Sequence, residues 1–352
     1  MNLSNRCHLA GGLLVLWLCI SSPGAGPVGG YHLIKKVPFG AAEGSTNEYF
    51  DYITVDPAAR RVYLSHGTEV KVLDADTANV VGNITGFKRD HGVALAPELN
   101  RGFVSDGGAA QVVVFDTKTL KKIGQVKADD DADSILYDPA SKRIFAFNGE
   151  PHSATVIDPA NATAVATIPL GGQPEQAVTD GMGTIYDNVE STNEVIAIDS
   201  RALKVKSRWK VAPGGQPVSI AMDRQHKRLF IGCRNPKVLV VMDAENGKII
   251  GQPFPIGDRV DTTIYDPETG MVASSTREGT IHIMHEDSPD KLSVVETVKT
   301  EFGAKTMGFD PKTHNLFVDT SDFDPAPPKT EKQPNPQPVA KPGTFRLLIY
   351  GR

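Results

Sequence analysis

One short turn recurs seven times along this chain of 352 residues, and this repeat restricts the possible folds more than any other feature. An Asp-led turn followed by an apolar strand ("VDPAARRVY") surrounds Asp56, and related stretches return every 40 to 44 residues. An Asp at the first turn position accepts a backbone hydrogen bond, and a Pro after it presets φ. The later copies begin at Ala96, Asp138, Asp180, Asp223, Asp266 and Asp310.

A second pattern recurs in step with the first. It consists of an apolar strand, an Asp-led turn and a half-polar strand, as in "VKVLDADTANVVG" and "VVVFDTKTLKKIG". Each repeat therefore carries four strands, and four-stranded units at this spacing are typical of propeller blades. A ring leaves no end strand exposed, whereas an open stack would. We predict an all-β, seven-bladed β-propeller of four-stranded blades, formed as a single domain by residues 31–352.

The two ends of the repeat region complement each other. The last unit supplies only three strands, "KTMGFDP", "NLFVDTS" and "FRLLIYG", whereas "YHLIKKVPFG" near the start resembles the outer strand of another unit. The N-terminal strand is therefore expected to close the last blade. A Pro-rich insert, residues 322–343, separates the second and third strands of that blade, and its composition predicts that it cannot join a sheet. It is either a disordered surface insert or a semi-rigid flap over one face.

The first 26 residues have the pattern of a secretory signal peptide. Arg6 precedes an apolar run from Leu9 to Ile20, which small residues follow. A run of about 12 residues is short for a membrane span. Cys19 follows the bulky Leu18, which argues against attachment of a lipid at this cysteine. We expect a periplasmic or secreted protein without a membrane span.

The cysteine content bears on whether a disulfide can form, and the net charge bears on whether the protein binds nucleic acid. Without the signal peptide only Cys233 remains, so no intramolecular disulfide can form, and a lone Cys beside apolar residues is expected to be buried. The net charge of −5 gives no reason to expect nucleic-acid binding, and no stacked aromatic and basic groove is evident. We expect a monomer that binds a small ligand or a protein partner.

The chain resembles the YncE/YVTN-type secreted β-propeller family of bacteria over nearly all of residues 31–352. The stretches that carry this resemblance are "FDYITVDPAARRVYLSHGTEVKVLD", "HGVALAPELNRGF", "ILYDPASKRIFAFNG" and "HEDSPDKLSVVETVKT". The resemblance implies the propeller fold and an exported protein, but it assigns no activity.

Ionisable residues occupy one position in six of the seven repeats, just ahead of the innermost strand. This position should lie near the axis at one end of the central channel. The six ionisable residues are Asp51, His91, Asp133, Glu175, Asp261 and Lys305, and the remaining repeat has Val218 at this position.

The loop between the second and third strands of each unit opens on the same face, and loops on a rigid scaffold often carry binding groups. Its first position is His66 in the first unit, which we include among the candidate ligand-binding residues. The corresponding positions are Asp106, Asn148, Val189, Cys233, Thr276 and Thr320, and nearby polar residues are Glu150, His152, Glu190, Asn193, Arg234 and Arg277.

Three functional interpretations stay open: a binding protein, an enzyme, and a scaffold in a larger envelope complex. Converging carboxylates must be hydrated, share protons or bind a cation. Asp51, Asp133, Glu175 and Asp261 could bind a divalent metal such as Ca²⁺, whereas participation of a histidine would favour Zn²⁺. The favoured function is a binding protein with a polar axial site for a small ligand, a metal or a protein partner. The alternative is a lactonase-like, metal-dependent hydrolase or lyase with His91 as the catalytic base.

Overall fold

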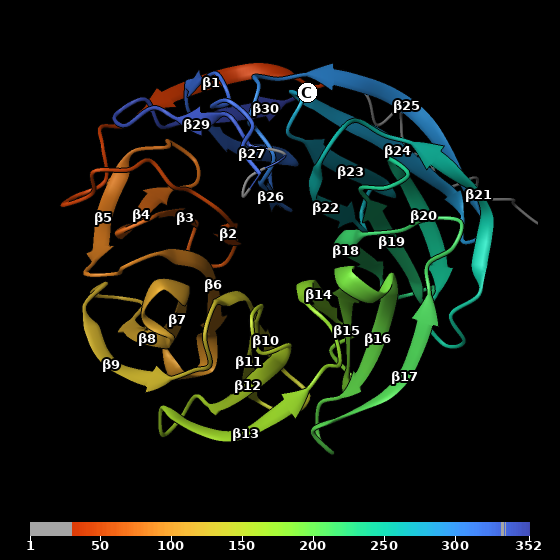
Figure 1. Ribbon diagram of the computed structural model, residues 1–352, viewed down its shortest axis with the longest axis horizontal. Coiled ribbons are helices and arrows are strands. Elements are labelled where there is room, and N and C mark those ends of the chain that lie inside the picture. Colours follow the sequence, from red (N-terminus) through yellow and green to blue (C-terminus); the bar gives the residue numbers. More distant parts are fainter. Residues whose placement is uncertain (1–29, 332–333, 335) are drawn as a thin grey trace, which may run out of the picture.

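In the computed structural model, which describes residues 30–331, 334 and 336–352, each repeat folds into a four-stranded antiparallel sheet. Seven such sheets are arranged as blades around a central axis, with β2, β6, β10, β14, β18, β22 and β26 innermost (Figure 1). The predicted all-β, seven-bladed propeller is confirmed.

The strands of each blade follow one another outwards from the axis. Blade 1 consists of β2 (Ile53–Asp56), β3 (Arg61–His66), β4 (Glu69–Asp74) and β5 (Val80–Thr85). Blade 2 consists of β6 (Asp90–Ala96), β7 (Arg101–Asp106), β8 (Gln111–Asp116) and β9 (Lys122–Lys127). Blade 3 consists of β10 (Ala132–Asp138), β11 (Arg143–Asn148), β12 (Ser153–Asp158) and β13 (Thr163–Pro169). Blade 4 consists of β14 (Pro174–Thr179), β15 (Thr184–Val189), β16 (Glu194–Asp199) and β17 (Lys204–Lys210).

The remaining three blades complete the ring. Blade 5 consists of β18 (Pro217–Asp223), β19 (Arg228–Cys233), β20 (Val238–Asp243) and β21 (Ile249–Pro255). Blade 6 consists of β22 (Val260–Asp266), β23 (Met271–Thr276), β24 (Thr280–Ser288) and β25 (Lys291–Lys299). Blade 7 consists of β26 (Met307–Asp310), β27 (Asn315–Thr320), β30 (Arg346–Gly351) and β1 (His32–Pro38). Short 3-10 helices lie in three of the turns: η1 (Pro97–Leu99), η2 (Gly107–Ala109) and η3 (Glu190–Thr192).

The hydrophobic core lies between neighbouring blades. The second and third strands of each blade are buried on both faces, whereas outer strands such as β5 are mostly exposed. Met271 and Ile281 of blade 6 share one buried cluster with Leu316 and Leu348 of blade 7. The blades therefore depend on one another for burial, as expected of a closed ring of repeats.

The N-terminal strand closes the ring as predicted. β1 pairs antiparallel with β30, from His32 opposite Gly351 to Pro38 opposite Arg346. Tyr31, which precedes β1, is buried, and its hydroxyl donates a hydrogen bond of 2.9 Å to the carbonyl of His314. The single cysteine of the described residues, Cys233, is buried as predicted, and burial raises the pKa of its thiol to about 12.

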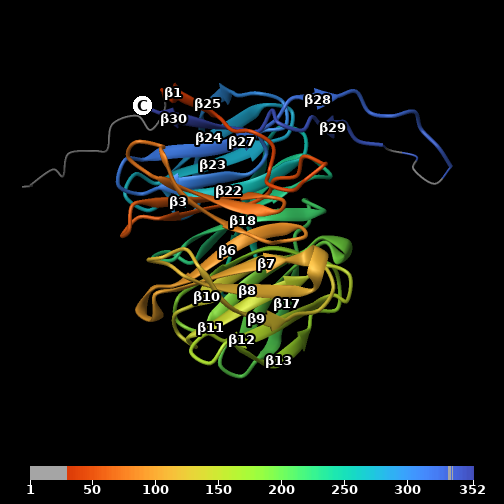
Figure 2. The ribbon, with the colours of Figure 1, turned by 90° about the vertical axis from the view of Figure 1, so that its left-hand side faces the viewer.

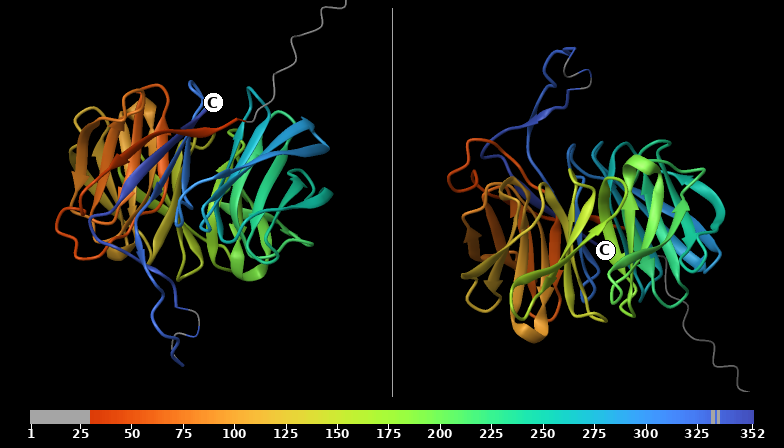
Figure 3. Two further views of the ribbon diagram at one scale, coloured as in Figure 1. Left: turned by 90° about the horizontal axis from the view of Figure 1, so that it is seen from above. Right: turned by 60° about the horizontal axis from the view of Figure 1, so that its bottom comes forward.

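The Pro-rich insert departs from expectation because part of it does form a sheet. β28 (Phe323–Asp324) pairs with β29 (Val339–Ala340), and the described residues between 323 and 340 project from the ring as an arm (Figures 2 and 3). Two short strands can pair here because Pro residues are absent from 323–324 and 339–340. The backbone N–H of Gly343, just beyond the arm, donates to Glu48 at 2.7 Å. We call the side of the ring that bears the arm the top face.

The predicted signal peptide, residues 1–26, lies outside the described residues. Within the described part, no helix has the length and apolar character needed to cross a membrane.

Candidate functional site on the ring axis

Local backbone geometry turns the predicted ionisable residues towards the axis. The pairing of the first two strands shifts register near the start of the innermost strand in blades 2 to 6, and such bulges re-aim side chains. Buried serines from the second strands fix the same backbone. Ser65 accepts a hydrogen bond from the N–H of Asp51 at 2.9 Å, and Ser105 donates to the carbonyl of Asp133 at 2.5 Å.

Asp51, His91 and Asp133 meet at a single point, and we call them the Asp-His-Asp centre. Nδ1 of His91 lies 2.8 Å from Asp51 Oδ2 and 2.9 Å from Asp133 Oδ1. The hydroxyl of Tyr49 lies 2.9 Å from the same nitrogen. One ring nitrogen carries at most one hydrogen, so it cannot donate to three oxygens at once. Three oxygen atoms therefore converge on one point, and one ligand atom from each member of the centre lies within 4.8 Å of the others.

The charges of the centre depend on one another. Burial lowers the pKa of His91, but Asp133 and Asp51 outweigh this effect and raise it to about 10. Burial raises the pKa of Asp133. Burial also opposes ionisation of Asp51, but Lys305 and His91 lower the pKa of that carboxyl below its usual range. The two acids therefore favour the imidazolium form of His91.

The centre is part of a larger ring of charges, which we call the axial ring: Asp51, His91, Asp133, Glu175, Arg234, Asp261 and Lys305, one from each blade. Lys305 Nζ lies 2.5 Å from Asp261 and 3.3 Å from Asp51. Arg234 Nη2 lies 2.5 Å from the other oxygen of Asp261. Positive and negative groups therefore alternate from blade 5 through blades 6, 7, 1 and 2 to blade 3.

The alternation is interrupted between blades 3 and 4. Glu175 has no ion pair with a described residue, and burial together with Asp133 raises its pKa well above the usual range. The neighbouring carboxyl group of Glu190 also raises the pKa of Glu175. Two acids, Asp133 and Glu175, thus follow one another in the axial ring.

Two of the four acids proposed from the sequence as metal ligands do not belong to the Asp-His-Asp centre. Asp261 is already neutralised by Lys305 and Arg234. Glu175 interacts with Glu190 instead. Ligand atoms of Asp51, His91 and Asp133 lie together, whereas the neighbouring blades supply cations to Asp261 and a second acid to Glu175. The metal-ligand role of Asp51, Asp133, Glu175 and Asp261 stays a prediction.

His66 is buried within the blade, so the structure does not bring it together with the axial residues predicted to bind a ligand. Its side chain is fully buried, stacks on Phe345 at 4.1 Å and lies 2.5 Å from Glu48. The second strand ends inside the blade rather than at its rim, and the seven aligned positions are all buried. They are His66, Asp106, Asn148, Val189, Cys233, Thr276 and Thr320.

The polar members of that set support the loops. Asp106, for example, accepts hydrogen bonds of 3.0 Å from the backbone N–H groups of Lys88 and Arg89. Thr320 donates to the carbonyl of Phe302 at 2.7 Å. These contacts satisfy backbone groups that would otherwise be buried without partners.

Asp319, next to the axial ring, gives a pH-dependent prediction. Its side chain is buried, Thr306 donates to Oδ1 at 2.6 Å, and burial raises its pKa to about 8. The folded state thus keeps a proton that the unfolded chain loses near pH 4, so stability should fall as pH rises from about 4 to about 8. Asp319→Asn removes this loss. In thermal melts, the free energy of unfolding of the variant should rise relative to that of wild type between pH 5 and pH 8. The difference should grow by up to about 1.4 kcal/mol per pH unit.

The control for that measurement is Asp290→Asn, because the Asp290 side chain is 73% exposed. Its melting temperature should follow wild type across the pH range. Parallel curves for Asp319→Asn and wild type would contradict the assignment of a buried, protonated carboxyl group.

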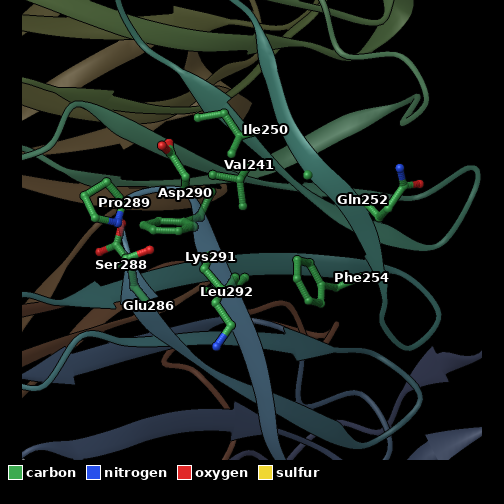
Figure 4. A pocket seen from close by; sticks show the side chains of 12 residues that line it. Val241, Ile250, Gln252, Phe254, Glu286, Ser288, Pro289, Asp290, Lys291 and Leu292 are labelled. Atoms are coloured by element: carbon green, nitrogen blue, oxygen red, sulfur yellow. The ribbon is translucent and has the colours of Figure 1, made fainter.

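Two further features lie away from the axial ring. A cavity of about 200 Å³ lies where β21 faces the β24–β25 hairpin, lined by Ile250, Phe254 and Leu292 among others (Figure 4).

A second group of possible metal ligands comprises Asp223, His226 and Glu286. Asp223 is already used by its turn, because it accepts a hydrogen bond of 2.9 Å from the backbone N–H of Gln225.

Arg234 was expected only as a polar side chain of a loop, but it belongs to the axial ring. Val218 leaves the blade 5 position without a charge, and Arg234 of the following loop fills it. Tyr49, two residues ahead of Asp51, was not predicted either, and its hydroxyl donates to Asp51 at 2.9 Å. The only feature of the sequence that could have indicated Tyr49 is an aromatic residue two positions before the aligned charged residue Asp51.

Comparison with known proteins supports the fold and assigns no family. No protein-family model matches the chain, and neither does any curated protein. A chain in the structure described as "Kuenenia stuttgartiensis Hydrazine Synthase" is similar, with a TM-score of 0.70 and 15% identity over 86% of this chain and 99% of that one. At this identity the likeness concerns architecture alone, so the chain is a seven-bladed β-propeller similar in fold to that protein.

Proposed function

We propose that this protein is an exported β-propeller binding protein whose axial ring binds one divalent transition metal at the Asp-His-Asp centre. The observation that carries the proposal is the convergence of Asp51, Asp133 and Tyr49 oxygens on Nδ1 of His91. A set that mixes imidazole nitrogen with carboxylate oxygen suits Zn²⁺ and related metals better than Ca²⁺, which prefers oxygen alone. Export rests on the signal-peptide pattern of residues 1–26.

The surroundings of the centre are compatible with this role. Lys305 contacts Oδ1 of Asp51 and leaves Oδ2 on the side of His91. Asp133 Oδ1 is buried and accepts no hydrogen bond of good geometry in the described residues. Groups that hold metal-ligating carboxylates in place usually strengthen binding, and Lys305 acts in this way on Asp51. When a metal binds, the proton on Nδ1 of His91 is displaced.

A binding role is favoured over the hydrolase or lyase alternative because His91 is poorly placed to move protons. Its side chain is 2% exposed, and its Nε2 faces Gly107 so closely that a Cβ built on that glycine would lie 2.9 Å away. With Nδ1 at the centre and Nε2 buried, His91 has no free nitrogen for a substrate. An enzyme built on this centre would need another group as its general base.

The test is titration calorimetry of metal-free protein with Zn²⁺, with Ca²⁺ as a comparison. We expect one Zn²⁺ per chain, weaker or no Ca²⁺ binding, and a loss of at least about tenfold in Zn²⁺ affinity for Asp133→Asn. The matched control is Asp223→Asn, which removes a carboxylate from the other Asp/His/Glu group and should leave the affinity unchanged. Equal affinity in Asp133→Asn and wild type, or loss confined to Asp223→Asn, would overturn the proposal.

A further inference from the structure

A second site lies beside the axial ring on the top face, where three guanidinium groups gather. Arg234, Arg259 and Arg277 line a cavity of about 490 Å³ together with Lys305. The volume lies in the range of cavities that accept small organic molecules. Arg234 follows β19, Arg259 precedes β22 and Arg277 follows β23, so consecutive loops of blades 5 and 6 supply the cations.

The acidic residues of this cavity are already neutralised. Asp261 is paired with Lys305 and Arg234, and Asp258 lies 3.2 Å from the ammonium group of Lys237. Glu190 lies 3.7 Å from Arg234. These pairs leave two cations of the cavity, those of Arg259 and Arg277, without a carboxylate partner among the described residues.

Arg277 contacts two aromatic rings and the arm, although it has no carboxylate partner among the described residues. Its guanidinium lies 5.6 Å from the centre of the Phe323 ring and 6.0 Å from that of Phe302. Its Nη2 donates to the carbonyl of Pro338, in the arm, at 3.2 Å. Burial and the nearby charge of Arg259 lower the pKa of Arg277. A poorly compensated guanidinium is suited to an anion, because an oxyanion supplies the missing charge and accepts paired hydrogen bonds.

The arm extends the site with apolar walls. Arg277 also lines two neighbouring cavities of about 520 and 530 Å³, which include Pro327 and Pro338 of the arm. Phe302 lines the first of them and Phe323 the second. An anion bound at Arg277 would therefore have aromatic and proline surfaces beside it for an apolar group.

We propose that the cavity between Arg259 and Arg277 binds a small organic anion, whose carboxylate or phosphate contacts both guanidinium groups and whose apolar body lies against Phe302, Phe323 and the arm. The site uses no member of the Asp-His-Asp centre. It therefore goes beyond the proposed metal site and can be tested in metal-free protein.

The experiment is titration calorimetry of metal-free, chelator-free protein with four probes: benzoate, phenyl phosphate, inorganic phosphate and uncharged benzamide. We expect saturable binding of benzoate or phenyl phosphate, at least about tenfold weaker binding of inorganic phosphate, and none of benzamide. Whether benzoate or phenyl phosphate binds more tightly distinguishes a carboxylate from a phosphate ligand. Binding of benzamide as tight as that of benzoate would overturn the proposal, because charge would then play no part.

Substitutions locate the site. Arg259→Gln and Arg277→Gln should each weaken binding of the preferred probe at least about tenfold, as expected for a lost charge-assisted hydrogen bond. Arg143→Gln is the matched control, since Arg143 lies at the first turn of blade 3, on the opposite face, 3.7 Å from Asp158. It should bind as wild type does. If Arg277→Gln folds poorly, the affinity of Arg259→Gln for the preferred probe tests the proposal by itself. Undiminished affinity in Arg259→Gln would overturn the proposal.

Replacing residues 325–338 of the arm with two glycines tests the apolar walls. The pairing of β28 with β29 is retained, whereas Pro327 and Pro338 are lost. We expect this variant to prefer phenyl phosphate over inorganic phosphate less strongly than wild type does, because Phe302 and Phe323 remain while the prolines are lost. An undiminished preference for phenyl phosphate would contradict the part assigned to the arm.

Discussion

A chain that begins at residue 41 rather than residue 31 is expected to lose a large part of its stability, because β1 is the fourth strand of blade 7. Six residue pairs join β1 to β30, and Tyr31 packs in the core between blades 6 and 7. At about 1 kcal/mol for each hydrogen bond, with Tyr31 burial added, the loss is on the order of 5 kcal/mol. Domains are usually stable by about 5–15 kcal/mol, so this loss removes about a third or more of the free energy of unfolding and should lower the urea concentration at the midpoint.

Urea denaturation followed by circular dichroism measures this loss. The control is the arm variant in which two glycines replace residues 325–338, which removes more residues but almost no buried core. Its free energy of unfolding should lie within about 1 kcal/mol of wild type, as for other changes in exposed segments. A larger loss for the arm variant than for the shortened chain would contradict ring closure by β1.

The second large effect is expected from Lys305→Met in the axial ring. Lys305 neutralises Asp261 and Asp51, and the side chains of these acids are 10% and 11% exposed. Removing one partner of a buried ion pair usually costs about 3–5 kcal/mol, because a charge is left without compensation. Arg234 and His91 continue to neutralise the two acids, so we expect a loss near the lower end, about 3 kcal/mol.

The matched control is Lys36→Met, which breaks an ion pair of 2.8 Å with Glu301. The Lys36 side chain is 47% exposed, and pairs in contact with solvent contribute at most about 1 kcal/mol. Urea denaturation of both variants at pH 7 compares the two pairs directly. Equal losses in the two variants would mean that the axial ring is as well solvated as the surface.

The architecture could be predicted because it depends on a repeated pattern. A strand pattern repeated every 40 to 44 residues gives the blade number, and the missing fourth strand of the last unit predicts closure by β1. The same repeat aligned the ionisable residues, and the structure brings Asp51, His91 and Asp133 together and pairs Lys305 with Asp261. Equivalent positions in a ring of similar blades must lie near one another at the axis.

Features that vary between blades could not be predicted in this way. Arg234 enters the axial ring from the loop that follows β19, in the blade whose own axial position is the uncharged Val218, and Glu175 meets Glu190 only through the local course of η3. His66 occupies the same repeat position as Thr320, and only the three-dimensional structure shows that the second strands end inside the blades. Such details depend on side-chain packing between neighbouring blades, which a repeat pattern does not specify.

Anomalous diffraction at the zinc absorption edge, from crystals grown with Zn²⁺, tests the central claim most directly. The proposed metal site predicts one strong peak among Asp51 Oδ2, His91 Nδ1 and Asp133 Oδ1, at about 2.1 Å from each atom. Tyr49 should then bind to Asp51 alone, since His91 Nδ1 would be occupied by the metal. A zinc-soaked crystal with no peak at this position, in which His91 still bridges the two carboxylates, would contradict the claim.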